Sequence, residues 1–235
     1  MLKWIKLKNY MKKLLEKIRR IPDKLLSKIG GGFFWRYRHI FYKKWAADYL
    51  GEKSVNSPHR KLLIEKISSY APFETAFEFG CSSGPNLFLL SQKFPNAKFY
   101  GTDISDYALK FGQRWFNNKN IKNVKLISGN TNVLKQFNDK SIDIVFTDAT
   151  LVYIGPLQIK NVLKELLRLA RKMVLLIEWH TNSPKSIFVD HWAHNYDELL
   201  KDLGYKNKIK FTKIPEEIWA AEWVKYGYII EIPLA

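Results

Sequence analysis

The sequence has a single cysteine, few acidic residues for its number of basic ones, and no long uncharged apolar run. With Cys81 as the only cysteine, a disulfide framework and zinc sites built from several thiolates are excluded. A membrane-spanning helix needs about 18 uncharged apolar residues in a row, and no stretch of the chain approaches that length. Hydrophobic residues make up 46% of the 235, which allows a sizeable core and excludes wholesale disorder. We expect a folded protein of a reducing, cytoplasmic compartment.

The excess of basic over acidic residues is concentrated in the N-terminal part of the chain. Lys and Arg number 39 against 22 Asp and Glu, a formal charge of +17. Residues 1–70 hold 18 of these basic residues and only 5 acidic ones. We therefore predict a basic, aromatic-rich helical extension at residues 1–70 and one domain at residues 71–235.

The first 26 residues have the pattern of a basic amphipathic helix. Apolar residues recur every three or four positions between Trp4 and Leu25, and lysine and arginine fill most of the remaining positions. Such a helix is typical of segments that lie on anionic membrane surfaces. Packing against its own domain or a partner helix, and contact with nucleic acid, remain alternatives. Lysines interrupt every candidate apolar core, so a secretory signal is not expected.

Residues 33–50 are crowded with aromatic rings at helical spacing, interleaved with arginine and lysine. Rings beside basic residues can stack on nucleic-acid bases, cover a substrate pocket or lie at a lipid headgroup boundary. A helix that simply packs on the domain is the fourth possibility. The sequence leaves these four open.

From residue 75 onward, short apolar runs alternate with helical patterns. This alternation predicts a doubly wound, mostly parallel α/β sheet, whose ligands bind at the carboxyl ends of the strands. Strands are expected at residues 75–79, 98–102, 124–127, 142–146, 173–177, 208–214 and 225–232, and helices at 85–94, 105–117, 156–171 and 196–203.

The first of these strands runs into a short loop with two glycines. Gly80 and Gly84 permit a tight turn and close approach of the backbone to a ligand, and Pro85 suits the first position of a helix. The dinucleotide pattern G-x-G-x-x-G fails at Ser82, and no Lys-Ser/Thr follows to make a P-loop. Asp103 ends the second strand, where its carboxylate can accept hydrogen bonds from both hydroxyls of a ribose.

These residues, in this order, resemble class I S-adenosylmethionine-dependent methyltransferases over residues 72–180. The resemblance implies a seven-stranded Rossmann-like sheet with an antiparallel last strand, enzymatic activity, and S-adenosylmethionine as cofactor. It places Glu78 near the methionine amino group, Asp103 on the ribose, Ile104 against adenine and Asn130 near the adenine amino group. The implied cofactor-binding residues are Glu78, Gly80, Cys81, Gly84, Asp103, Ile104, Asn130, Thr131 and Asp148.

Candidates for the chemistry follow the fourth and fifth strands, at the same sheet edge as the loop. Asp148 is placed to face the methyl group or the acceptor, Tyr153 to form a pocket wall or donate a hydrogen bond, and His180 to act as a general base. His191 and His194 have the i, i+3 spacing that can hold a metal on a helix. No carboxylate or thiolate cluster accompanies them, so we expect no metal and treat both, with Tyr153, as candidates for the acceptor pocket.

Taken together, the sequence predicts a methyltransferase that works at the cytoplasmic face of a membrane. The preferred reaction is transfer to oxygen of a glycan, a lipid-linked sugar or another small amphiphile. One alternative is an RNA or protein methyltransferase that uses the basic arm, although no RNA-binding module is recognisable. The other is a protein that binds cofactor or a partner without catalysis. The sequence leaves the oligomeric state open.

Overall fold

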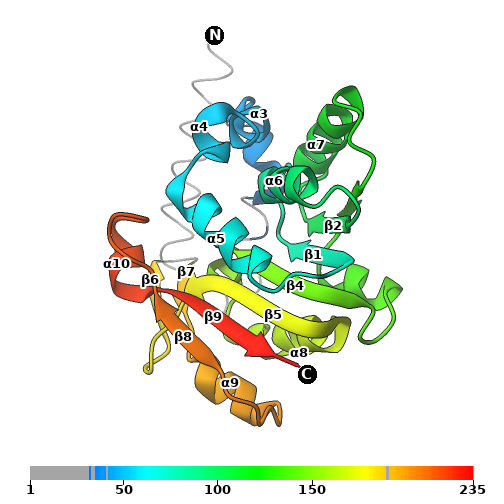
Figure 1. Ribbon diagram of the computed structural model, residues 1–235. Helices are drawn as coiled ribbons and strands as arrows, with labels where there is room; N and C mark the ends of the chain where they lie inside the picture. The colour runs from blue at the N-terminus through cyan, green and yellow to red at the C-terminus, as the bar shows by residue number, and fades with distance from the viewer. Residues whose placement is uncertain (1–31, 33–34, 41, 189–190, 235) are drawn as a thin grey trace, which may run out of the picture.

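A computed structural model describes residues 32, 35–40, 42–188 and 191–234 of the chain (Figure 1). The predicted amphipathic helix at residues 1–26 lies outside this range. Among the described residues, no helix is both long and apolar enough to cross a membrane.

A seven-stranded sheet forms the centre of the molecule, in the spatial order β3-β2-β1-β4-β5-β9-β8. Six strands run parallel, and β9 is antiparallel to both of its neighbours. The predicted seven-stranded Rossmann-like sheet with an antiparallel last strand is therefore confirmed. The strands are β1 (Thr75–Phe79), β2 (Lys98–Asp103), β3 (Val124–Ser128), β4 (Ile142–Asp148), β5 (Ala170–Trp179), β8 (Lys210–Lys213) and β9 (Gly227–Pro233).

Helices cover both faces of this sheet, which explains why its central strands are almost continuously apolar (Figure 1). One face carries α5 (Pro58–Ser68), α6 (Pro85–Lys93) and α7 (Asp106–Asn118), and the other carries α8 (Ile159–Leu169) and α9 (Tyr196–Asp202). In α8 the buried residues recur at three- and four-residue steps, so a single apolar stripe meets the sheet. In α7 the Ser105 side chain accepts from the Ala108 N–H and fixes where the helix begins.

The N-terminal helices of the described range are built onto this domain. They are α3 (Trp45–Tyr49), α4 (Glu52–Val55) and α5. Trp45 is 1% exposed and shares a core cluster with Ala108 of α7. The Ser83 hydroxyl donates to the Ala46 carbonyl oxygen at 2.8 Å, which ties α3 to the loop after β1. The boundary at residue 70 stays a prediction, but α5 packs on the sheet, α3 and α4 pack on α7 and α6, and all three helices line the cavity.

Several short elements differ from the sequence-based expectation. A separate hairpin is made by β6 (Lys185–Phe188) and β7 (His191–Ala193), and α10 (Glu222–Tyr226) takes the first two residues of the strand predicted at 225–232. His191 therefore lies on a strand, and His194 forms an isolated bridge with His180. The helical geometry considered for a histidine metal pair is wrong, because an extended backbone turns successive side chains to opposite faces.

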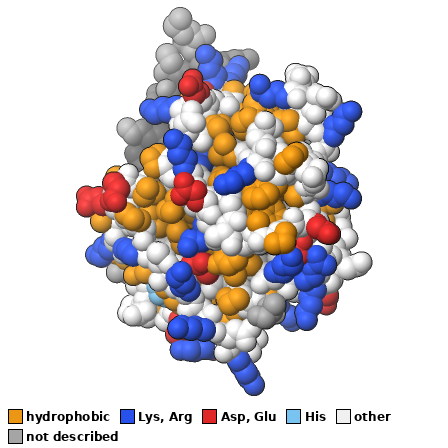
Figure 2. Space-filling model, in the orientation of Figure 1, with side chains coloured by type: hydrophobic (Ala, Val, Ile, Leu, Met, Phe, Trp, Pro, Cys, Tyr) orange, Lys and Arg blue, Asp and Glu red, His pale blue; other side chains and the backbone are white. Residues whose placement is uncertain are grey.

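Basic side chains are spread over the face of the molecule shown in Figure 2. Lysine and arginine are scattered there among hydrophobic and neutral groups, with no continuous basic stripe. A groove that follows a nucleic-acid backbone requires such a stripe. The polymer-binding alternative rests on the basic arm, most of which lies outside the described residues, and stays an alternative.

Candidate functional site

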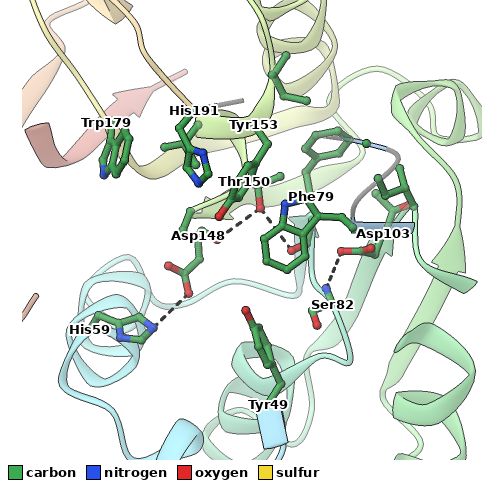
Figure 3. A pocket seen from close by; sticks show the side chains of 18 of the residues that line it. Tyr49, His59, Phe79, Ser82, Asp103, Asp148, Thr150, Tyr153, Trp179 and His191 are labelled. Atoms are coloured by element: carbon green, nitrogen blue, oxygen red, sulfur yellow. Dashed lines mark hydrogen bonds and ion pairs between the residues drawn. The ribbon is translucent and has the colours of Figure 1, made fainter. Parts of the chain in front are cut away.

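A cavity of about 580 Å³ opens at the carboxyl ends of the parallel strands. Its volume is within the range usual for small-molecule sites. One half is lined by the loops after β1, β2 and β3, and the other by the N-terminal helices, the β4 and β5 ends, β7 and α10. Asp148, the last residue of β4, lines the cavity between these halves (Figure 3).

The loop after β1 is held in a left-handed, tightly turned conformation. Gly80, Ser82 and Gly84 have φ of 84°, 54° and 89°, the region in which glycine is unstrained. A Cβ on Gly80 would come within 2.2 Å of the Thr150 hydroxyl oxygen, so Thr150 can pack directly on this loop only because Gly80 has no side chain. The loop and the chain after β4 therefore fit together as one surface.

The Asp103 carboxylate is fixed at the end of β2 by two backbone amides. It accepts from the Ser82 N–H at 2.9 Å and from the Ser105 N–H at 2.8 Å. Burial raises its pKa, and these hydrogen bonds oppose the shift. A carboxylate has about four acceptor positions, so capacity remains for hydroxyl donors of a ligand in the cavity it lines.

A buried polar network connects β1 to Asp148. The Asn86 amide donates to Glu78 at 2.6 Å and to the Asp148 carboxylate at 3.0 Å. The Arg60 guanidinium donates to the Asn86 oxygen at 2.7 Å and to Asp148 at 3.3 Å. Burial raises the pKa of Glu78 to about 8, although the Asn86 hydrogen bond favours its ionised form. Glu78 Oε2 and Asp148 Oδ1 are buried with no hydrogen-bond partner among the described residues.

The loop after β4 is held from behind by Glu178 of β5. This carboxylate is fully buried and accepts from the Thr150 N–H at 2.9 Å and the Val152 N–H at 3.1 Å. Ala149, which precedes these residues, has φ of 53°. Burial raises the pKa of Glu178 to about 7, against the effect of these backbone amides. Glu178 thus sets the position of the segment that carries Tyr153 into the cavity.

Aromatic rings form most of the second half of the cavity (Figure 3). Tyr153 packs edge-on against Trp35 at 5.0 Å and His191 at 4.6 Å between ring centres. Trp179 contacts both His191 and Trp223, and Trp219 stacks on Trp223 at 3.8 Å with their planes 4° apart. Rings of this kind offer flat apolar faces to a ring-bearing ligand. The rings lining this half are those of Trp35, Tyr49, His59, Tyr153, Trp179, His191, Trp219 and Trp223.

Only some of the predicted site residues line the cavity. Those that line it directly are Gly80, Asp103, Ile104, Asp148, Tyr153 and His191. Glu78, Cys81 and Gly84 are buried in or next to the loop, and the exposed Asn130 begins the short 3-10 helix Thr131–Gln136. Whether these residues bind cofactor stays a prediction.

Two predicted histidines do not line the cavity. His180 accepts from the Tyr196 N–H at 3.3 Å, and its ring packs against Phe211. His194 is 2% exposed and donates from Nε2 to the Ile154 carbonyl oxygen at 2.8 Å. Burial lowers the pKa of His194 to about 4. Neither side chain is placed to contact a ligand in this cavity.

Sequence reasoning missed the residues that approach from the two ends of the chain. His59 and Arg60 lie in the segment assigned to the extension, and Trp219 and Trp223 lie in a loop for which no role was predicted. The i, i+4 spacing of the two tryptophans is a weak local signal. His59 has no such signal, because only the packing of α5 beside β4 brings it near Asp148.

Comparisons with known proteins agree with this architecture. A family model described as a methyltransferase domain matches residues 76–173. A search of curated protein sequences gives no significant match. Among solved structures, magnesium protoporphyrin IX methyltransferase from Synechocystis, with bound SAM, is 17% identical, with 92% of this chain and 98% of that chain covered at a TM-score of 0.60.

Two further structures are similar at comparable levels. A SAM-dependent methyltransferase from Aquifex aeolicus is 18% identical, covering 81% of this chain and 97% of that chain at a TM-score of 0.57. Geranyl diphosphate C-methyltransferase from Streptomyces coelicolor is 13% identical, covering 74% of each chain at a TM-score of 0.58. At these identities the likeness concerns the fold, and the acceptors differ among the neighbours.

Proposed function

We propose that this chain is a class I methyltransferase that uses S-adenosylmethionine and that it methylates a hydroxyl oxygen of a small amphiphilic acceptor. A glycan or a lipid-linked sugar is the preferred acceptor class. The observation that carries this proposal is the cavity itself, in which a glycine loop with an acid and a chamber of aromatic rings meet at Asp148.

The loop half of the cavity fits the cofactor chemically. Glu78 Oε2 and Ser82 Oγ are buried polar atoms without hydrogen-bond partners among the described residues, and buried polar atoms are normally satisfied. Asp103 has acceptor capacity for the ribose hydroxyls, and Ile104 lines the same half with an apolar surface suited to adenine. We propose that Glu78, through the protein network it shares with Asn86, serves the methionine end.

When bound, the cofactor supplies an electrophilic methyl group on a sulfonium. The protein residues have the tasks of orienting the acceptor and excluding water. Tyr153 packs against Trp35, and Trp219 stacks on Trp223, so the rings restrict where an acceptor ring can lie. Asp148 presents a carboxylate between the two halves, where an acceptor hydroxyl would enter.

The mixture of rings and polar groups favours a hydroxylated, ring-bearing acceptor. Aromatic faces bury the apolar face of a sugar or another ring, while Arg60, Asp148 and Glu222 in the same lining can hydrogen-bond hydroxyls. A purely hydrocarbon acceptor would leave Asp148 Oδ1, a buried atom without a hydrogen-bond partner among the described residues, unpaired. This supports transfer to oxygen on a polar ring, with an apolar tail as the amphiphilic part.

A membrane location is supported by the surface beside the cavity. Tyr37, Ile40 and Tyr42 are exposed large hydrophobic residues close in sequence to Trp35, which lines the cavity. Lys43 and Lys44 are exposed next to them. Aromatic and basic side chains together suit the headgroup region of an anionic membrane. We therefore propose peripheral attachment at the cytoplasmic face, with the basic sequence of residues 1–26 adding attraction.

The first part of the test is calorimetric titration of S-adenosylhomocysteine into the full chain. Wild type should bind, and Asp103→Ala should weaken binding by about 10–100-fold, because a charge-assisted hydrogen bond contributes about 1.5–3 kcal/mol. Asp106→Ala is the matched control, since Asp106 follows closely in sequence but is exposed and outside the cavity lining. Equal affinity of wild type and Asp103→Ala would contradict this cofactor site.

The second part follows a labelled methyl group from S-adenosylmethionine to three hydroxyl probes. Octyl β-glucoside represents a sugar amphiphile, while phenol and 4-nitrophenol are flat rings with weakly and strongly acidic hydroxyls. We expect transfer to octyl β-glucoside to be fastest. Transfer to none of the three by a protein that binds S-adenosylhomocysteine would overturn the proposed O-methylation.

A further inference from the structure

His59 stands in the cavity at the start of α5, opposite Asp148 (Figure 3). Its Nε2 lies 3.9 Å from Asp148 Oδ2, and Figure 3 shows the two groups turned toward each other. The imidazole stacks on Trp219 at 4.2 Å between ring centres, which restricts its rotation. The sequence interpretation gave His59 no role, and its place in the cavity depends on the packing of α5.

Asp148 is held in place independently of His59. Its Oδ2 accepts from Arg60 at 3.3 Å and from Asn86 at 3.0 Å, and its side chain is only 5% exposed. A carboxylate fixed in this way can stabilise a positive charge that appears on the neighbouring imidazole. Asp148 can therefore act as the partner of a histidine base, as well as a wall of the cavity.

The groups around His59 leave it neutral and able to accept a proton at neutral pH. Burial lowers its pKa, as does the Arg60 guanidinium on the same helix, while the Asp148 carboxylate on β4 opposes them. Glu222 of α10 lines the same cavity and is the further charged group on this side. A general base works best when its pKa is near or below the working pH, so that most molecules carry the free base.

We propose that His59 is the general base that removes the proton from the acceptor hydroxyl and that Asp148 stabilises the resulting imidazolium. This assignment rests on the proposed O-methylation. The acceptor O–H bond breaks and its proton passes to the imidazole. The oxygen electron pair forms the new bond to the methyl carbon, and the carbon–sulfur electron pair leaves with sulfur. The sulfonium charge is thus replaced by the imidazolium charge beside Asp148.

His191 is the other histidine in the lining, and its surroundings differ. It lies between Tyr153 and Trp179 on the aromatic wall, with ring centres 4.6 Å and 5.7 Å away. These contacts suit a wall of the acceptor chamber. His191→Gln therefore serves as a comparison that shares the chamber with His59.

Methyl transfer to the fastest of the three hydroxyl probes is measured from about pH 5 to about pH 9. Wild-type kcat should rise with pH through one inflection and then level off, because only neutral His59 accepts the proton. His59→Gln should lower kcat by about 10²–10⁴-fold and remove the inflection. His39→Gln is the control, since His39 also stacks on a ring, Tyr107, but is not in the cavity lining.

A second measurement needs neither cofactor nor acceptor. Proton NMR titration of the histidine rings follows His59, which is identified by the signal that disappears in His59→Gln. The pKa of His59 should lie below that of an exposed histidine, and Asp148→Asn should lower it further because the opposing carboxylate charge is gone. An unchanged His59 titration in Asp148→Asn would overturn the pairing.

The outcomes separate this assignment from the function on which it rests. If wild type methylates no probe, both the O-methylation and the base are overturned. If wild type methylates a probe and His59→Gln keeps its rate and inflection, only the base is overturned. Loss of the inflection in His191→Gln but not in His59→Gln would also overturn the assignment of His59 as the base. Equal affinity of His59→Gln and wild type for S-adenosylhomocysteine shows that the variant is folded.

Discussion

Ser82 occupies a backbone position that favours glycine. Its φ of 54° lies in the left-handed region, where an L side chain is strained by about 1–2 kcal/mol. Its hydroxyl is buried with no hydrogen-bond partner among the described residues, while its N–H holds Asp103. The backbone conformation rather than the side chain therefore serves the site, unless a ligand pairs with the hydroxyl.

Ser82→Gly should leave the free protein unchanged or more stable by up to about 1 kcal/mol. Relief of strain exceeds or balances the extra entropy that glycine loses on folding, about 0.5–1 kcal/mol. Denaturant unfolding without ligand measures the change. If the Ser82 hydroxyl forms a hydrogen bond to the cofactor, the variant should bind S-adenosylhomocysteine up to about 10-fold more weakly than wild type.

Gly84→Ala provides the opposite case within the same loop. Gly84 also has positive φ, and a Cβ there would lie 2.9 Å from the Phe116 ring. Strain and crowding together should cost about 1–3 kcal/mol. If the free energy of unfolding of Gly84→Ala equals that of Ser82→Gly, this loop is not held in the conformation described.

At the scale of elements, Glu178 joins β5 to the loop that follows β4. It receives the Thr150 and Val152 amides, and Thr150 in turn packs on Gly80. The loop after β1 and the wall that carries Tyr153 therefore share one anchor. Because the anchor is a buried carboxyl group, its protonation links the site to pH.

Glu178→Gln should reduce the pH dependence of stability. Burial raises the pKa of Glu178 to about 7 from 4.5, so the folded protein binds this proton more tightly than the unfolded chain. The contribution of this proton to the free energy of unfolding is complete below about pH 4.5. It is lost as the pH rises through about 7, which lowers the stability by about 3 kcal/mol.

Unfolding of the variant and wild type is compared at about pH 5 and about pH 8. Near pH 5 the variant should be less stable by about 1–3 kcal/mol, since an amide replaces one acceptor oxygen with a donor. Near pH 8 that deficit should shrink or reverse. Glu65→Gln, at an exposed position of α5, is the control. A deficit that is the same at both pH values would contradict the raised pKa.

At the scale of the whole molecule, the cavity is assembled from segments that are distant in the chain. His59 comes from the N-terminal helices, Asp103 and Asp148 from the sheet, and Trp219 and Trp223 from α10 and the segment before it. Enclosure by segments from both parts of the described chain would limit the access of water to the proposed methyl transfer, in which water would compete as acceptor.

The basic N-terminal sequence should attach the molecule to anionic membranes. Full chain is floated with vesicles of phosphatidylserine and phosphatidylcholine, and with phosphatidylcholine alone, beside a variant that lacks residues 1–30. We expect flotation of the full chain with anionic vesicles only, falling as salt is raised, because charge screening weakens each lysine contact. The shortened variant should float less. Equal flotation of the two proteins would reject the membrane role of residues 1–30.

The sequence alone determined the sheet and carried the resemblance to class I methyltransferases. The central strands of the sheet are buried on both faces, so their apolar runs were visible locally, and β1 was predicted at residues 75–79 as observed. Gly80, Gly84 and Asp103 stand at fixed places relative to those strands, and their order carries the resemblance that implies the cofactor. The hairpin at residues 185–193 and α10 were missed because such short elements carry too little periodicity.

Only the tertiary structure decided which polar residues meet in the cavity. His180 ends a strand at the expected edge, yet its ring turns away and packs against Phe211. His59 has no motif, yet α5 brings it to Asp148 across the cavity. The direction of a side chain and the neighbours of a helix depend on packing between distant segments, whereas strands and turns depend on neighbours in the chain. The fold could therefore be predicted from the sequence, whereas the proposed base could not.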